Sequence, residues 1–228
     1  MSSFHQHLPS GRVSISNDVV AAVPYSRLAL RDWIVEAYEM TGLTRRLTEL
    51  DLQALLSQAG FPFAEIPVSN QAFTTKVSRG QWVEFQEHFQ EVLTLLRQIS
   101  SVWNLEDPCV ISGFDMDRVG TIQALSTEPT GTFICRFSMS QPGCLVLACK
   151  IASQRSQDDS DNLIHAILKI SDLRERRVDT WIRDFSGATH VLDVYHHKRV
   201  DKRKVFTSNY TNLRGLSNHD MGFDSIVA

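Results

Sequence analysis

The chain has 228 residues, of which 43% are hydrophobic and 21% are charged. This length and composition are typical of a globular protein with one large core or two smaller ones, and they exclude a disordered or collagen-like chain. The formal net charge of −3 creates no overall positive field that would attract nucleic acid or anionic lipid.

The sequence predicts neither a signal peptide nor a membrane span. Residues 1–20 contain no apolar run of signal-peptide length, and no segment approaches the roughly 20 apolar residues that cross a bilayer. Three of the four cysteines lie in apolar strand-like runs, and the chain has no CxxC pair, so buried thiols are expected at Cys109, Cys135, Cys144 and Cys149. We therefore expect a cytoplasmic or nuclear protein without a membrane partner.

The first hundred residues predict helices. Apolar residues recur at helical spacing over 28–40, 52–60 and 81–100. Thr48 and Asp51 have the spacing of a capping box, as do Ser78 and Gln81. These patterns favour a helical domain over residues 1–101.

Strand patterns begin after this helical region. Apolar and β-branched runs predict strands over 132–138, 144–151 and 163–170, the first two joined by a short loop as antiparallel neighbours. Asp115 is predicted to cap a short helix over 118–125, and apolar spacing predicts another helix over 173–185. The expected fold class is α+β, with a central antiparallel sheet flanked by two helices.

Arg136 lies in the middle of the first predicted strand, among residues that favour burial. Alternation along a strand places Arg136 on the same face as Ser138 and, beyond it, Ser140 in the following loop. A buried guanidinium needs a partner. A nearby carboxylate is one alternative; the other is a tetrahedral dianion such as phosphate, which arginine binds bidentately with help from hydroxyls and loop amides.

Three motifs of this region resemble a known family. They are Ile111-Ser-Gly-Phe114, then Pro129-Thr-Gly-Thr-Phe-Ile-Cys-Arg-Phe-Ser138-Met-Ser140, then Gly143-Cys-Leu-Val-Leu147. Beginning at Trp103, their order is similar to that of the Src-homology-2 (SH2) domain of the signal transducer and activator of transcription (STAT) family. The resemblance implies an SH2-like domain over residues 102–214, a tail over 215–228, and a preceding region like the family's helical linker domain.

The resemblance also implies a phosphotyrosine site. Arg136 corresponds to the arginine that binds the phosphate, Ser138 and Ser140 to assisting hydroxyls, and His165 to a residue beside the phosphotyrosine ring. Asp117 stands where the family has a basic residue, and Arg118 follows it. Either Arg118 replaces that basic residue through a small shift, or the charge of Asp117 weakens the site.

In the family, a phosphorylated tyrosine beyond the domain lets two molecules exchange tails. Tyr210 is the candidate for phosphorylation nearest the end of this sequence. It corresponds better to a structural tyrosine of the last segment of the domain, so a homodimer of this kind stays an open alternative.

The remaining clusters of histidine, acidic and basic residues do not indicate a further functional site. His190, His196 and His197 lack a carboxylate or cysteine at ligand spacing, so no metal is expected. The acidic residues of 158–161 and the basic residues of 198–204 are interpreted as solvated surface, and direct DNA binding is not expected from this chain alone. No motif of a catalytic nucleophile, nucleotide cofactor or metalloprotease occurs, so neither a cofactor nor enzymatic activity is expected.

The sequence thus predicts a module that binds tyrosine-phosphorylated proteins or peptides in signal transduction, with a link to transcription regulation. One alternative is a scaffold of the same fold whose phosphotyrosine pocket is weakened or lost, acting through protein partners. A further alternative is that the chain is part of a longer transcription factor whose DNA contacts lie elsewhere.

Overall fold

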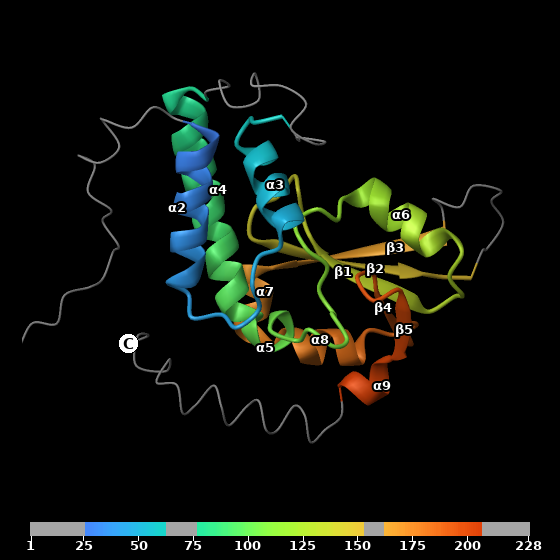
Figure 1. Cartoon of the computed structure of the whole chain (residues 1–228). Coiled ribbons are helices and arrows are strands. Elements are labelled where there is room, and N and C mark those ends of the chain that lie inside the picture. The colour runs from blue at the N-terminus through green and yellow to red at the C-terminus, as the bar shows by residue number, and fades with distance from the viewer. Residues whose placement is uncertain (1–25, 63–76, 153–161, 207–228) are drawn as a thin grey trace, which may run out of the picture.

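The structure is a computed structural model that describes residues 26–62, 77–152 and 162–206 (Figure 1). The helical region contains α2 (Arg27–Glu39), α3 (Glu49–Gln58), α4 (Arg79–Gln98) and the short α5 (Ser100–Trp103). Tyr210, the tail over 215–228 and the acidic residues of 158–161 lie outside the described residues. Among the described helices, none combines the length and apolar character needed to cross a membrane.

Both predicted capping boxes are confirmed. The Thr48 hydroxyl accepts a hydrogen bond from the amide of Asp51 at 3.1 Å, and the Asp51 carboxylate accepts one from the amide of Thr48 at 2.9 Å. Ser78 and Gln81 form the same reciprocal pair at the start of α4. Each box satisfies two backbone amides that a helix start leaves without partners, which is why α3 and α4 begin where they do.

The sheet has five strands in the order β3-β2-β1-β4-β5. The predicted strands are present as β1 (Thr132–Phe137), β2 (Cys144–Lys150) and β3 (Leu163–Lys169), which pair antiparallel in sequence order. Two further strands complete the sheet, β4 (His190–Asp193) and β5 (Lys198–Asp201).

The expectation of a central antiparallel sheet is confirmed for β1, β2 and β3 and wrong for β4, which pairs parallel to β1. Both β4 and β5 are four residues long, and β5 consists of Lys-Arg-Val-Asp, so neither shows the apolar alternation that reveals a strand. The short helix α9 (Lys202–Val205) follows β5 directly. The fold is therefore α+β with a mixed sheet.

The predicted helix over 173–185 is in fact two helices, α7 (Ile170–Glu175) and α8 (Val178–Asp184). Arg176 between them is extended, with φ −149° and ψ 129°. The four residues from 174 to 177 are all charged, so no apolar side chain holds this stretch against the core as one helix.

The short helix before β1 is α6 (Arg118–Ser126), but the prediction that Asp115 caps it was wrong. Asp117 is the N-cap, and its carboxylate accepts a hydrogen bond from the amide of Gly120 at 2.7 Å. The carboxylate of Asp115 instead accepts a hydrogen bond from the hydroxyl of Tyr195 at 3.3 Å. Only Asp117 is adjacent to the first helical residue, as an N-cap must be.

The two faces of the sheet carry different side chains. The apolar face consists of alternate residues of β1 and β2 that belong to the main hydrophobic core: Phe133, Cys135, Phe137, Leu145, Leu147 and Cys149. The opposite face, here called the Arg136 face, includes Ile134 and Ala148 in a small second core with Leu125 of α6. In Figure 1, α6 lies above the sheet and α8 below it. All four cysteine thiols are buried and unpaired, as predicted.

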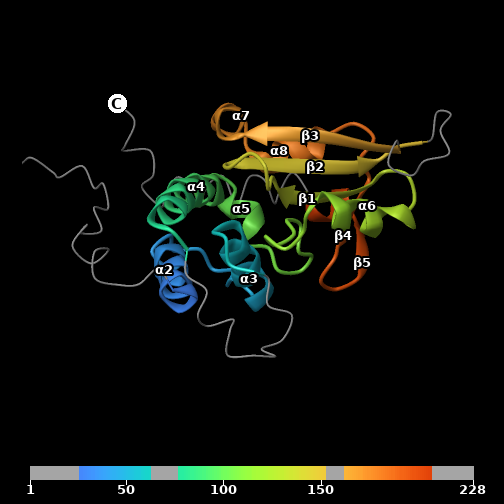
Figure 2. The ribbon, with the colours of Figure 1, turned by 90° about the horizontal axis from the view of Figure 1, so that it is seen from above.

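The helical region and the sheet share the main core (Figure 2). At their junction the indole of Trp103 donates a hydrogen bond to the hydroxyl of Tyr38 at 2.7 Å, and this hydroxyl donates to the carbonyl of Arg45 at 2.6 Å. The guanidinium of Arg45 lies 3.8 Å from the centre of the Trp103 ring. The Trp103 ring also packs edge-on against Phe137 of β1, with ring centres 5.4 Å apart, so α5 joins the helical region to the sheet.

Candidate anion-binding site

Arg136 is the buried cation of the Arg136 face. Its side chain comes from β1 opposite Val146 of β2, and the residue is only 6% exposed. Its Nη1 donates to the carbonyl of Phe137 at 2.9 Å, whereas its buried Nε has no hydrogen-bond partner among the described residues. Burial lowers the pKa of Arg136, and the charge of Asp117 partly opposes this effect.

No carboxylate of the described residues lies within ion-pair distance of Arg136. The described ion pairs use other cations, including Arg31, Arg176 and Lys198. Of the two alternatives raised by the sequence, a paired carboxylate is therefore absent from the described part of the chain. A buried guanidinium with a free donor is suited to an anionic ligand.

His165 lies on the same face as Arg136. Register pairs His165 of β3 with Ala148 of β2, and Ala148 with Ile134 of β1. Its ring nitrogen Nδ1 is buried and has no partner among the residues that the structure describes. Burial lowers the pKa of His165, and the charges of Arg118 and Arg136 lower it further. The imidazole therefore lies within electrostatic range of both guanidinium groups.

Arg118, an exposed residue, is the first residue of α6. Its charge acts on both Arg136 and His165, lowering the pKa of each. The two guanidinium groups therefore repel each other, and the imidazole of His165, whose pKa is lowered, lies within electrostatic range of both. An anion bound among them would relieve that repulsion, which makes the cluster a candidate anion site.

Asp117 supplies a carboxylate close to this cluster. Its charge raises the pKa of Arg136, so the two side chains are within electrostatic range without forming an ion pair. Its Oδ1 already accepts the Gly120 amide at the start of α6. Asp117 therefore has a structural role as a helix cap in addition to any effect on the anion site.

Ser138 and Ser140 occupy the loop between β1 and β2. The hydroxyl of Ser138 accepts a hydrogen bond from the amide of Gln141 at 3.1 Å and retains its own proton for donation to a ligand. Ser140 is exposed, and no contact between Ser140 and Arg136 occurs among the described residues. The structure therefore brings Arg118, Arg136 and His165 together, places Ser138 at the end of the same strand, and leaves Ser140 further along the loop.

Val146 and Ala148 of β2 lie on the Arg136 face, where Val146 pairs with Arg136 and Ala148 with His165. Neither residue was predicted to belong to the site. Their alternation within the run Cys144–Lys150 is the signal that could have found them, because Ala148 is the smallest side chain on that face.

A hollow of about 830 Å³ lies elsewhere on the molecule. Its walls come from the end of α8, the turn into β4, the start of α9 and Phe206. Thr189 in its lining donates a hydrogen bond to the carbonyl of Gly131, which precedes β1. The hollow is therefore at the end of β1 opposite to the loop that carries Ser138.

The histidines and the basic segment over 198–204 show ordinary surface contacts. No group of three potential metal ligands occurs in the described part of the chain. His196 contacts the Asp193 carboxylate through Nδ1 at 2.8 Å. Within the basic segment, Lys198 pairs with Asp107 and Arg199 with Glu128.

Comparisons with known proteins do not assign the chain to a family. No protein-family model matches it, and no curated protein matches its sequence. The resemblance to the STAT family therefore rests on the sequence motifs of residues 103–147 alone.

Proposed function

We propose that this protein binds tyrosine-phosphorylated peptides or proteins on the Arg136 face, as an SH2 module of the STAT type. The observation that carries the proposal is the buried Arg136, whose Nε lacks a partner and which has no described carboxylate at ion-pair distance. The order α6, β1, β2, β3, α7, α8 agrees with the expected strands between helical segments and supports the finer assignment.

In the proposed complex, Arg136 binds the phosphate bidentately, since charge-assisted hydrogen bonds of this geometry are the strong ones. Arg118 and Ser138 complete the phosphate shell, and His165 lies beside the phosphotyrosine ring. A phosphoserine side chain is too short to reach Arg136 while also filling the space beside His165. The proposed role is signal transduction from tyrosine kinases in the cytoplasm, with transcription regulation in the nucleus as its outcome.

A scaffold with a weakened pocket is the second candidate function. The observation that favours it is the charge of Asp117, which acts on Arg136 and would repel a phosphate dianion. In this case the protein would act through surfaces other than the Arg136 face, and phosphorylated peptides would bind no better than unphosphorylated ones.

Titration of a tyrosine-phosphorylated peptide library, with unphosphorylated and phosphoserine peptides as controls, separates these functions. We expect micromolar or tighter binding that needs the phosphate. Arg136→Ala should weaken binding by about 100-fold, because two charge-assisted hydrogen bonds together contribute about 3 kcal/mol. Arg199→Ala, at an exposed arginine that pairs with Glu128, is the matched control and should bind normally. Equal affinity of Arg136→Ala and wild type would refute the phosphotyrosine function.

A further inference from the structure

Helix α3 contacts both segments that border the candidate anion site. Its first turn touches the segment that leads into α6, and its last residue touches the loop between β1 and β2. These contacts come from Asp51 and Gln58, which are about 10 Å apart along the helix axis. α3 belongs to the helical region, which carries none of the proposed phosphate ligands.

Asp51 is fully buried, and its carboxylate accepts hydrogen bonds from two different residues. Its Oδ2 accepts hydrogen bonds from the amide and hydroxyl of Thr48, closing the capping box. Its Oδ1 accepts the amide of Phe114 at 2.7 Å. The capping box needs only one carboxylate oxygen, so the second bond ties α3 to the segment before α6.

The segment that Asp51 holds is fixed on its other side by β1. Ile111 forms a parallel bridge with Cys135, and the amide of Ser112 donates to the Cys135 carbonyl at 2.8 Å. At Gly113 an added Cβ would lie 2.2 Å from the Asp51 carboxylate, so the backbone approaches α3 too closely for any other residue. Arg118 follows Phe114 by four positions, so its place depends on this anchored backbone.

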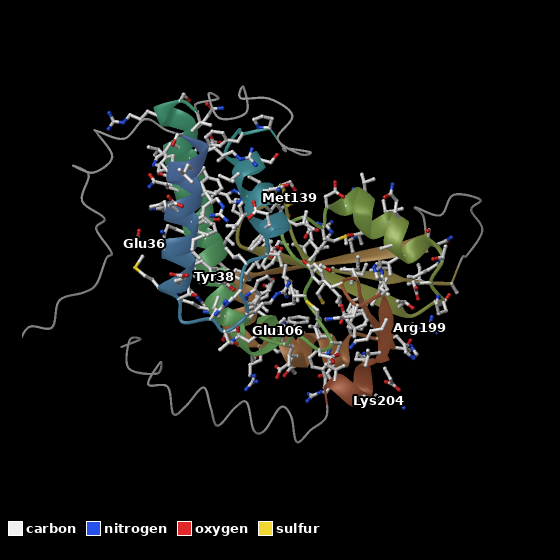
Figure 3. All side chains as sticks on the ribbon, viewed as in Figure 1. Glu36, Tyr38, Glu106, Met139, Arg199 and Lys204 are labelled. Carbon is white, nitrogen blue, oxygen red and sulfur yellow. The ribbon has the colours of Figure 1, made fainter. Side chains whose placement is uncertain are left out.

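Gln58 holds the opposite border of the site. Its Nε2 donates to the sulfur of Met139 at 3.5 Å. Met139 directly follows Ser138 in the loop, and Figure 3 shows its side chain beside α3. One rigid helix therefore contacts the segment that positions Arg118 and the loop that carries Ser138.

We propose that α3 is a positioning element of the anion site, in which Asp51 and Gln58 set the distance between Arg118 and the Ser138 loop. Neither residue touches the ligand. This positioning role rests on the proposed phosphotyrosine function. It means that the helical region raises the affinity for the phosphorylated ligand by holding Arg118 and the Ser138 loop in place. Outer-shell contacts of this kind orient ligand-binding groups and have measurable effects on affinity.

The test measures the dissociation constant of a phosphotyrosyl peptide, and of phenyl phosphate, for the full chain and four variants. We expect Asp51→Asn to weaken binding about tenfold, at the low end of outer-shell effects. Gln58→Leu should weaken it less, about threefold, because it removes a single neutral hydrogen bond to sulfur of roughly 0.7 kcal/mol. Gln53→Leu makes the same substitution in the same helix, away from the contacts described here, and should bind as wild type does. Leu56→Ala removes part of a buried core side chain and should lower stability without changing affinity.

Side-chain NMR signals of the Arg118 and Arg136 Nε–H groups provide a readout without ligand. They should shift in Asp51→Asn and Gln58→Leu and stay in place in Leu56→Ala. If Asp51→Asn fails to fold, Gln58→Leu by itself tests the positioning role of α3. Wild-type affinity in Gln58→Leu, with unshifted arginine signals, would overturn the positioning role and leave the phosphotyrosine function intact. If the wild-type protein binds neither the phosphotyrosyl peptide nor phenyl phosphate, both the positioning role and the phosphotyrosine function are overturned.

Discussion

The two faces of the sheet differ in what they bury and in how they are covered. The apolar face packs Phe133 and its neighbours into the main core, which includes α4, α5 and α8. On the Arg136 face, the small second core includes Leu125 of α6 and buried residues such as Ile134, and Arg136 is buried on the same face. One face is suited to stability and the other to binding a charged ligand.

The difference shows why a cation can be kept in the middle of a strand. On the apolar face, the rings of Phe114 and Phe137 stack with their centres 4.3 Å apart and hold β1 against the main core. This apolar packing on one face of β1 offsets the free-energy cost of burying the Arg136 guanidinium on the other face. Ile167, 46% exposed on the same side as His165, indicates that this face is incompletely covered along β3.

The largest expected effect separates the stability of the two faces. Phe133→Ala should lower the free energy of unfolding by about 3–5 kcal/mol, because it opens a cavity in the main core. Arg136→Met on the opposite face should change it by no more than about 1 kcal/mol, because it replaces a buried charge by an apolar side chain of similar length. Urea unfolding of both variants measures the contrast. Equal losses would show that the faces do not differ in this way.

The next effect separates the two roles of Asp117. Asp117→Ala should lower the free energy of unfolding by about 1 kcal/mol through loss of the α6 cap, whereas Asp117→Ser keeps a capping oxygen and should remain near wild type. Both variants should bind a phosphotyrosyl peptide about fivefold more tightly, since a charge repulsion of about 1 kcal/mol is removed. Calorimetric titration checks the affinity. An unchanged dissociation constant in Asp117→Ser would mean that Asp117 does not weaken the site.

A smaller effect concerns the other end of α6. The Nζ of Lys150 donates hydrogen bonds to the carbonyls of Leu125 and Ser126. Lys150→Met should lower the free energy of unfolding by about 0.5–1 kcal/mol, because the last carbonyls of the helix lose a cationic donor. Thermal unfolding measures the change, and Lys204→Met, at an exposed lysine of α9, is the control. An equal loss of unfolding free energy in Lys204→Met would show that Lys150 does not stabilise the end of α6.

The smallest effect is a pH dependence. Burial and the two arginines lower the pKa of His165 in the folded state, so the unfolded chain takes up a proton first, near pH 6.5. The stability that depends on a neutral His165 is therefore fully present above about pH 6.5, and it is lost as the pH falls toward the lower pKa of His165 in the folded state. His165→Gln should reduce this decline between pH 7.5 and 5.5 in urea unfolding.

His88, whose pKa burial also lowers, provides the comparison. His88→Gln should remove its own share of the pH dependence and leave the NMR titration of His165 unchanged. Bound phenyl phosphate should raise the pKa of His165, because an anion stabilises the protonated ring. A His165 titration unaffected by phosphate would place the anion away from this residue.

The sequence by itself was sufficient for the features that depend on neighbouring residues. Apolar spacing located α2, α3 and α4, two capping boxes located the starts of α3 and α4, and alternation predicted that Arg136 and Ser138 share a face. These signals act over a few residues, where backbone geometry and periodicity determine which side chains meet. The error at α6 concerns the cap alone: the helix start was predicted at 118, and the residue directly before it, Asp117 rather than Asp115, is the N-cap.

The tertiary structure alone decided the features that join distant segments. The parallel pairing of β4 with β1 begins where Thr189 meets Gly131, 58 residues away along the chain. The hydrogen bond from the Phe114 amide to the second carboxylate oxygen of Asp51 likewise links separate elements. Such contacts follow from the packing of whole faces against one another, and no spacing along a single segment of the chain encodes them.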